Sequence, residues 1–179
     1  MKKASLILTF FIFIFASCKK DSNSSIPSNS QKLHIGDTAY GGNVFYIDSI
    51  TKHGLVCATT DQSAGAVWDN SSNANYLYNY TPTGATGTAI GTGATNTTKR
   101  ISVLGSNGVA ASLCRNYRGG GFTDWFLPSK DELNELYINS AVVGGLASSS
   151  YWSSSEFVSS SNSSAWFQYF FNGNQYYYY

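Results

Sequence analysis

A strongly apolar stretch opens the chain. Residues 5–17 are almost entirely apolar, and the basic residues Lys2 and Lys3 precede them. A basic start, a short apolar run and small residues at its end are typical of a secretory leader. The run is also shorter than the roughly 20 residues that a membrane-spanning helix needs. We therefore predict that residues 1–17 are a signal peptide.

Polar residues follow this apolar stretch. Residues 18–32 are rich in Ser and Asn and have no apolar periodicity. A segment of this composition buries too little apolar surface to fold, and it behaves as a flexible linker. We therefore predict a tether over residues 18–32. The remainder, residues 33–179, is long enough to form one domain with a hydrophobic core.

Short apolar segments between residues 33 and 61 predict three strands. In the middle segment, Val44 and Tyr46 would point to one face, and the residues that alternate with them to the other. Turn signals that contain glycine lie on both sides of it. Further on, residues 66–68 predict a brief apolar contact with the core. The polar sequence of residues 69–96 predicts a long loop.

Helical spacing of apolar residues begins at residue 97. Two short helices are predicted between residues 97 and 117, separated by a break that contains glycine. A third helix has a clear start, because Ser129 and Glu132 form a capping box. Leu133 and Leu136 would then face the core. The carboxylates near this helix start are explained by capping and need no catalytic role.

The end of the chain returns to strand patterns. Tyr151–Trp152 and Ala165–Phe171 each predict a strand, and Asn172-Gly173 predicts a two-residue type I′ turn. A returning strand is predicted over residues 174–179. The predicted fold class is therefore α+β, a single domain in which short helices pack on antiparallel sheet.

Six segments carry a family resemblance. In chain order they read GDTAYGGNVFYID, GLVCATTDQS, AASLC, DWFLPSKDELNELY, YWSSSE and AWFQYFFNGNQ. Together they resemble the Lcl C-terminal-like domain, a bacterial adhesin-type domain, from residue 35 onward. The resemblance implies a fold similar to C-type lectins and to formylglycine-generating enzymes. In such folds the sheet-rich C-terminal half displays the binding face, so the resemblance also implies a binding face there. Members of the family act as adhesins or have no assigned function.

One departure from the family concerns the closing strand. Family members continue past the C-terminal hairpin into a strand with a V-R-x-V-R-like stretch, whereas this sequence stops at Tyr179. The resemblance therefore implies either a truncated sequence or a sheet with an open edge. An open edge that is aromatic and uncharged is an aggregation hazard.

The residues around the end of the leader resemble a second bacterial pattern. Residues 15–18, Phe-Ala-Ser-Cys, resemble a lipobox, in which Cys18 becomes the acylated first residue of the mature protein. Lys20-Asp21 partly resembles the export signal of surface lipoproteins in Gram-negative bacteria. These resemblances imply an outer-membrane lipoprotein that is exposed at the cell surface and held by its N-terminal lipid. The alternative is an ordinary signal peptide followed by a chance cysteine.

Charge excludes one class of partner. Charged residues make up only 12% of the sequence, about half of the usual share. There is no basic stripe, which argues against nucleic acid as a partner. Gly, Ser, Thr, Asn and Tyr take the place of charged residues, and a surface of this kind suits neutral, hydroxyl-rich or protein ligands.

The sequence offers no convincing catalytic or metal site. The only histidines, His34 and His53, lack the spacing of zinc ligands. The carboxylates that calcium would need are scattered along the chain. The serines of WSSSE lack both a G-x-S-x-G context and a histidine partner. We therefore predict that the protein is not an enzyme and uses no cofactor and no metal.

Two cysteines remain after the lipobox. Cys57 and Cys114 lie in a predicted strand and on an apolar helix face. A secreted protein can join such a pair in a disulfide. Alternatively, each thiol is buried separately as a small apolar side chain. The sequence leaves both alternatives open.

The C-terminal aromatic segment is the best candidate for a binding face. Tyr and Trp give rigid contact area, Ser, Gly and Asn add adaptable hydrogen bonds, and exposed aromatic patches mark interaction sites. The candidate ligand-binding residues are Trp152, Glu156, Asn162, Trp166, Tyr169, Asn172, Asn174, Tyr176, Tyr177, Tyr178 and Tyr179.

These observations lead to two expectations about function. The first is a surface-anchored adhesion lipoprotein that recognises a glycan or a surface protein through this aromatic, Asn-rich face. The alternative is a structural or assembly component, a tip or accessory subunit, whose C-terminal hairpin pairs with a protein partner.

Overall fold

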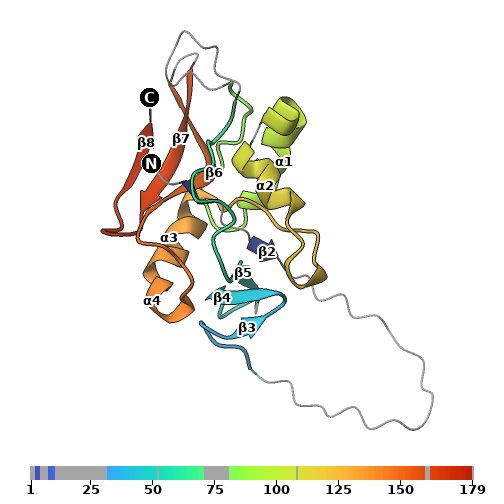
Figure 1. Cartoon of the computed structure of the whole chain (residues 1–179), viewed down its shortest axis with the longest axis vertical. Helices are drawn as coiled ribbons and strands as arrows, with labels where there is room; N and C mark the ends of the chain where they lie inside the picture. Colours follow the sequence, from blue (N-terminus) through green and yellow to red (C-terminus); the bar gives the residue numbers. More distant parts are fainter. Residues whose placement is uncertain are drawn as a thin grey trace, which may run out of the picture.

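The computed structural model has an α+β architecture in which short helices accompany two small sheets (Figure 1). The predicted fold class is therefore confirmed. Cys18, most of the tether, part of the predicted loop and Tyr179 lie outside the described residues. The structure describes residues 3–4, 8–10, 32–51, 53–70, 81–107, 109–159 and 162–178.

The first sheet contains the three strands that the N-terminal part of the domain predicts. Strands β3 (Thr38–Ala39), β4 (Gly42–Ile47) and β5 (Gly54–Cys57) pair antiparallel in that order. A register shift between Val44 and Tyr46 bends the central pair. At Gly42 a Cβ would collide with the backbone carbonyl of β5, so this close approach requires glycine.

The second sheet forms the C-terminal half of the domain. Strands β6 (Ser150–Ser159), β7 (Asn162–Tyr169) and β8 (Gln175–Tyr178) pair antiparallel in sequence order. Strand β6 is longer than the two-residue strand that the sequence predicts, because it continues through the serines and Glu156. In Figure 1 this sheet and the β3–β5 sheet lie toward opposite ends of the molecule.

A short N-terminal strand is added to each sheet. Strand β1 (Lys3–Ala4) pairs parallel with β6, and β2 (Leu8–Phe10) pairs antiparallel with β5. The sheet orders are therefore β1-β6-β7-β8 and β2-β5-β4-β3. Parts of the predicted leader thus contact the domain in the uncut chain.

Two helical segments follow the loop. Helix α1 (Gly93–Leu104) is followed by a short turn of 3-10 helix, η1 (Gly105–Asn107), and then by α2 (Val109–Asn116). The predicted break between two helices is therefore confirmed. Helix α1 starts four residues before the predicted residue 97, at the buried Gly93, where a Cβ would collide with Phe126 and Glu132. A second 3-10 turn, η2 (Gly119–Gly121), leads out of this region.

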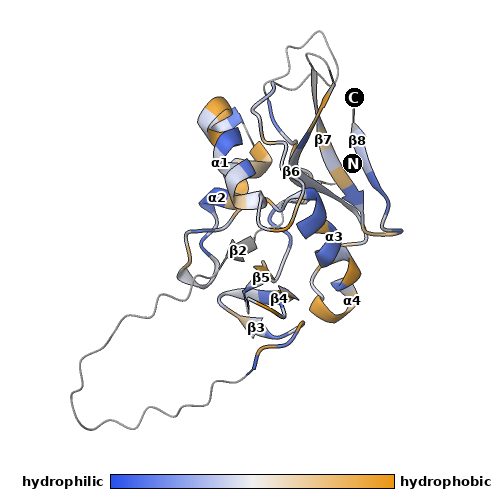
Figure 2. Ribbon diagram, turned by 180° about the vertical axis from the view of Figure 1, so that it is seen from behind, coloured by the Kyte–Doolittle hydropathy of each residue, from blue (hydrophilic) through white to orange (hydrophobic). Residues whose placement is uncertain are grey.

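Helix α3 (Lys130–Ile138) begins at the predicted capping box. The Ser129 side chain accepts from the Glu132 N–H, and the Glu132 carboxylate accepts from the Ser129 N–H at 2.7 Å. Leu133 and Leu136 are fully buried, as predicted. A short helix α4 (Ser140–Val143) follows. Figure 2 shows α3 as mostly hydrophilic and α4 as mostly hydrophobic.

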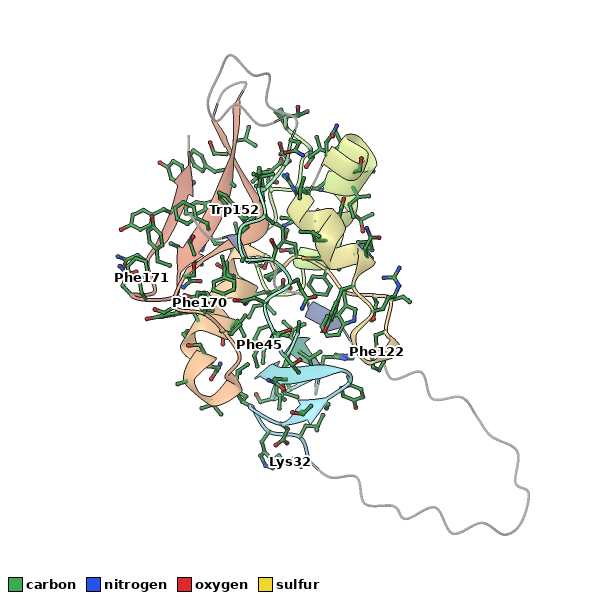
Figure 3. The ribbon with its side chains drawn as sticks, in the orientation of Figure 1. Lys32, Phe45, Phe122, Trp152, Phe170 and Phe171 are labelled. Carbon is green, nitrogen blue, oxygen red and sulfur yellow. The ribbon has the colours of Figure 1, made fainter. Side chains whose placement is uncertain are left out.

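The core consists of two neighbouring clusters. One gathers Trp68, Trp125 and Trp152 between the helices and β6. The other gathers Phe45 and Tyr151 with residues of β5 and α3. Figure 3 shows Phe45 and Trp152 in the interior of the molecule.

The two cysteines fall in different clusters. Cys57 lies in the core cluster that contains Phe45, and Cys114 lies in the core cluster that contains Trp125. Both are buried thiols that no disulfide joins. The structure therefore agrees with the second alternative, in which each thiol is buried separately. Burial raises the pKa of Cys57 to about 12, so this thiol stays protonated at neutral pH.

The predicted type I′ turn at the C-terminal hairpin is wrong. Such a turn requires a positive φ at both central residues. Gly173 has φ 81°, but Asn172 is not among the residues with positive φ. Strand β7 ends at Tyr169 and β8 begins at Gln175, so the connection is longer than two residues. The N–H of Gly173 donates to the Tyr169 carbonyl at 2.7 Å, which closes this wider loop.

A partly buried carboxyl next to the core gives a testable pH dependence. The Tyr151 hydroxyl donates to Asp61 Oδ1 at 2.8 Å. Desolvation raises the pKa of Asp61 above its ordinary value, so the folded protein holds this proton more tightly than the unfolded chain does. The stabilising contribution is thus present below about pH 4, the ordinary range of aspartate, and is lost as pH rises through the raised pKa.

Replacing Asp61 by asparagine removes this titration and keeps an oxygen that can accept from Tyr151. As pH rises from about 4, the wild-type melting temperature should fall relative to that of Asp61→Asn. Thermal unfolding of both proteins from pH 3 to pH 7 measures the difference. A difference that stays constant over this range would contradict the assignment of the titration to Asp61.

Candidate functional site

Two of the predicted binding residues are buried and form part of the structural framework. Trp152 is 2% exposed, and its ring N–H donates to the Ala66 carbonyl at 3.1 Å. Glu156 is 3% exposed. Neither side chain is available to a ligand, so their assignment to the binding face is wrong. The physical reason is that β6 lies inside the domain, between the helices and β7.

Glu156 instead organises the loop before α1. Its carboxylate accepts the backbone N–H of Thr83 at 3.0 Å and that of Ala85 at 3.2 Å. It also forms an ion pair with Arg100 on α1, at 3.2 Å between Nη1 and Oε1. Backbone amides and a buried guanidinium therefore satisfy the hydrogen bonds and the charge of this carboxylate.

Arg100 links three separate segments. Its Nη2 lies 2.8 Å from Asp69 Oδ2, and its guanidinium carbon lies 3.3 Å from the centre of the Trp68 ring. The side chains of Arg100, Asp69 and Glu156 are all fully buried. This ionic cluster fastens α1 to β6 and to the segment before the loop.

Three aromatic rings from three adjacent strands form one group, which we call the Trp166 cluster. Phe157 of β6 and Tyr177 of β8 stack with ring centres 4.0 Å apart and planes at 14°. Trp166 of β7 meets Tyr177 edge to face at 5.1 Å. All three side chains are partly exposed. The cluster arises because neighbouring strands place these residues on the same face of the sheet.

A polar group from α3 and β8 borders the Trp166 cluster. The Lys130 ammonium lies 5.6 Å from the centre of the Trp166 ring, within the range of a cation–π contact. It also lies 2.6 Å from Asp131 Oδ1 and 3.2 Å from Gln175 Oε1. An ammonium, a carboxylate and an amide therefore stand beside a partly exposed aromatic surface.

The fold holds this polar group in place. The Gln175 amide donates to the Lys130 carbonyl at 2.8 Å. The Lys130 N–H donates to Ser155 Oγ at 2.9 Å, so the first turn of α3 is attached to β6. The capping box then fixes the direction in which α3 leaves the sheet.

A second aromatic group, the Tyr176 cluster, gathers Tyr169, Phe171 and Tyr176. The rings of Tyr169 and Phe171 lie 4.7 Å apart, and those of Tyr169 and Tyr176 lie 5.6 Å apart. Phe171 is 59% exposed and Tyr176 is 46% exposed. Figure 3 shows Phe171 at the outer edge of the molecule. Since Tyr176 and Tyr177 are consecutive in β8, the two clusters lie on opposite faces of the hairpin.

Of the other predicted binding residues, some lie in the hairpin loop near the Tyr176 cluster and some lie outside the described part of the chain. Asn172 and Asn174 are exposed in the hairpin loop, where Asn174 Nδ2 donates to the Tyr176 hydroxyl at 3.3 Å. The side chains of Asn162 and Tyr178 and all of Tyr179 lie outside the described residues.

The predicted binding residues lack four members of the Trp166 cluster and its polar border: Phe157, Gln175, Lys130 and Asp131. The sequence explains Asp131 only as a carboxylate near the start of a helix. Phe157 follows Glu156 directly, and strand alternation from a longer β6 would have placed it beside Trp166. Gln175 lies two residues before Tyr177 on β8, so strand alternation places both side chains on the same face. Lys130 carries no such signal, because its position depends on how α3 packs against the sheet.

The described residues lack both a metal-ligand cluster and a membrane-spanning helix. Within them, no three His, Cys, Asp or Glu side chains gather as metal ligands. No helix among them has both the length and the apolar character needed to cross a bilayer.

Comparison with known proteins gives one match. A sequence model of the Lcl C-terminal domain matches residues 57–179. The matched region contains both aromatic clusters and α3. No curated protein and no solved structure matches the chain.

Proposed function

Because the chain belongs to the Lcl C-terminal domain family, we propose that it is a surface-anchored lipoprotein whose Trp166 cluster binds a glycan. One observation carries the proposal: three partly exposed rings lie beside an ammonium, a carboxylate and an amide. The lipobox-like residues before Cys18 support the membrane anchor.

The chemistry of the Trp166 cluster suits a sugar. The rings of Trp166 and Tyr177 offer an apolar surface on which the C–H face of a pyranose can stack. The side chains of Asp131 and Gln175 both lie at hydrogen-bonding distance from the Lys130 ammonium, and sugar hydroxyls can replace these two contacts. A binding site typically combines a mainly apolar lining with a few placed polar groups in this way.

A matched pair of variants tests the proposal. The full chain, purified in detergent, is applied to a glycan array that includes sulphated polysaccharides. Tyr177→Ser is expected to weaken binding about tenfold, the effect of removing one central aromatic contact. Tyr176→Ser changes the same residue type one position away, on the opposite face, and should leave binding unchanged.

Comparing the two variants shows whether the glycan binds at the Trp166 cluster or at the Tyr176 cluster. Equal losses in both variants would contradict an assignment to the Trp166 cluster. A folded protein that binds no glycan would reject the glycan proposal itself. Circular dichroism and thermal unfolding of each variant establish that any loss is not due to unfolding.

The Tyr176 cluster favours the second candidate function, assembly with a protein partner. Its exposed rings Phe171 and Tyr176 form a patch at the edge of the hairpin, and exposed apolar patches of this kind mark protein interfaces. Sedimentation and co-purification from membranes test this role. Tyr176→Ser should then disrupt the complex and Tyr177→Ser should not, the reverse of the pattern expected for glycan binding.

A further inference from the structure

Helices α1 and α2 lie side by side (Figure 1), and an open cleft of about 370 Å³ lies beside them. We call it the α1–α2 cleft. It is lined by α1, by the last turn of α2 and by the chain just before α3. The polar and aromatic residues of this lining are Thr95, Thr98, Lys99, Arg115, Asp124 and Phe126. A cleft of this size falls within the range of small-molecule sites.

Buried contacts hold the walls of the α1–α2 cleft. The Thr97 hydroxyl on α1 makes two hydrogen bonds with the backbone of the segment before α3, at 3.0 and 3.2 Å. Arg115 and Asp124 each adjoin a fully buried residue, Cys114 and Trp125 respectively. The core therefore fixes the backbone that carries both charged residues, although their side chains reach the solvent.

The opposite charges in the cleft do not contact each other. Arg115 donates to the Thr98 hydroxyl at 2.9 Å, and Lys99 donates to the Gly84 carbonyl at 2.8 Å. Among the described residues, no ion pair involves Arg115, Lys99 or Asp124. A guanidinium has five N–H donors and an ammonium has three, so both cations keep donors for a ligand.

The charges of the cleft select the charge pattern of its ligand. A simple anion would also meet the Asp124 carboxylate, and a simple cation would meet Arg115 and Lys99, so neither is complementary. Two cations and one carboxylate are complemented by two carboxylates and one ammonium. A dicarboxylic amino acid such as glutamate carries these three groups in one small molecule.

We propose that the α1–α2 cleft binds a free dicarboxylic amino acid. Arg115 holds one carboxylate in charge-assisted hydrogen bonds, and Lys99 holds the other. The Asp124 carboxylate accepts from the ammonium of the ligand. The Thr95 hydroxyl offers one more hydrogen bond, and Phe126 belongs to the apolar part of the lining. A few placed polar groups over an apolar surface are the usual composition of such a site.

A series of three ligands tests the charge pattern. Isothermal titration calorimetry at two temperatures uses the full chain, purified in detergent. L-Glutamate carries all three charged groups, glutarate lacks the ammonium, and L-glutamine lacks the side-chain carboxylate. We expect glutamate to bind at least about tenfold more tightly than either of the others, the usual effect of losing one hydrogen-bonded charge.

Variants assign the contacts to residues. Asp124→Asn should remove the preference for glutamate over glutarate, because only glutamate has the ammonium that Asp124 binds. Arg115→Gln should weaken the binding of both ligands at least about tenfold. Arg118→Gln is the matched control, since Arg118 is exposed, donates to backbone carbonyls and does not line the cleft. This control should bind glutamate as the unchanged protein does.

The other outcomes overturn the proposal. A folded protein that binds no glutamate at millimolar concentration has no such site. Equal affinity for glutamate and glutarate would mean a plain anion site, and a preference that survives Asp124→Asn would exclude the assigned role of that carboxylate. Equal losses in Arg115→Gln and Arg118→Gln would exclude the cleft. Thermal unfolding establishes that each variant is folded, and if one is not, the three ligands on the unchanged protein decide.

The proposal goes beyond glycan binding and does not rest on it. The Trp166 cluster lies on strands β6, β7 and β8, and none of its residues lines the α1–α2 cleft. Failure of the glycan array would therefore leave glutamate binding untouched, and failure of the calorimetry would leave the glycan proposal untouched.

Discussion

Replacing Arg100 by methionine is expected to lower the free energy of unfolding by about 3–5 kcal/mol, the usual cost of removing one partner from a buried ion pair. Methionine fills part of the space and can still pack against Trp68, but it supplies no charge. The carboxylates of Asp69 and Glu156 would remain in the interior, where their side chains are fully buried. Desolvation of two carboxylates without the guanidinium causes the loss.

The neighbouring residue provides the control for this variant. Lys99 is exposed and donates to the Gly84 carbonyl at 2.8 Å. Lys99→Met makes the same chemical change one position away and should cost less than about 1 kcal/mol. Urea unfolding followed by circular dichroism compares the two variants. Similar losses would show that Arg100 acts as a surface charge and would contradict the buried ionic cluster.

Replacing Glu132 by alanine is expected to cost about 2–4 kcal/mol, because it removes a helix cap and leaves two backbone donors, one of them buried, without their acceptor. The carboxylate accepts from the N–H of Ser129 and from the N–H of Gly91, each at 2.7 Å. It therefore fixes both the start of α3 and the chain that enters α1. Desolvation raises the pKa of this carboxyl, in agreement with its full burial.

Glu135→Ala is the matched control for Glu132→Ala. Glu135 lies three residues further along α3 and is partly exposed. This second variant should change stability by only a few tenths of a kcal/mol, as is usual for surface substitutions. Denaturant unfolding measures both. Equal losses of stability in the two variants would contradict a specific role for the contacts of Glu132 with Ser129 and Gly91.

Features encoded within a few residues were predictable from the sequence. The capping box needs only Ser129 and Glu132 at the right spacing, and the structure confirms it. The glycine-containing break between α1 and α2 and the three strands between residues 33 and 61 are local patterns of the same kind. The second role of Glu132, its bond to Gly91, joins residues 41 apart and left no trace in the pattern.

Features that depend on distant residues were not predictable in this way. Trp152 and Glu156 look like exposed binding residues because aromatic and acidic side chains often serve that role. Their burial follows from the packing of α1 and the residues near 66 and 83 against β6. The two-residue turn at Asn172-Gly173 failed for a related reason. That turn would pair residue 171 with residue 174, whereas the ladder between β7 and β8 ends at the pair Gln168–Gln175, in a register that differs by two residues.

The candidate site shows the same division. Alternation along β7 and β8 predicts that Trp166 and Tyr177 lie on one face of the hairpin and Tyr169 and Tyr176 on the other. The stacking of Phe157 on Tyr177 required the full length of β6, which the sequence underestimates. The approach of Lys130 to Trp166 required the position of α3 on the sheet.

A glycan bound at the Trp166 cluster would contact the Trp166 ring, and collisional quenching of tryptophan fluorescence measures this contact. Of the four tryptophans, Trp68, Trp125 and Trp152 are at most 2% exposed, so iodide should quench mainly Trp166. A saturating amount of a glycan identified on the array should protect this fluorescence, and Trp166→Phe should abolish the quenchable fraction. Glycan binding that leaves the quenching of Trp166 unchanged would contradict the proposed site.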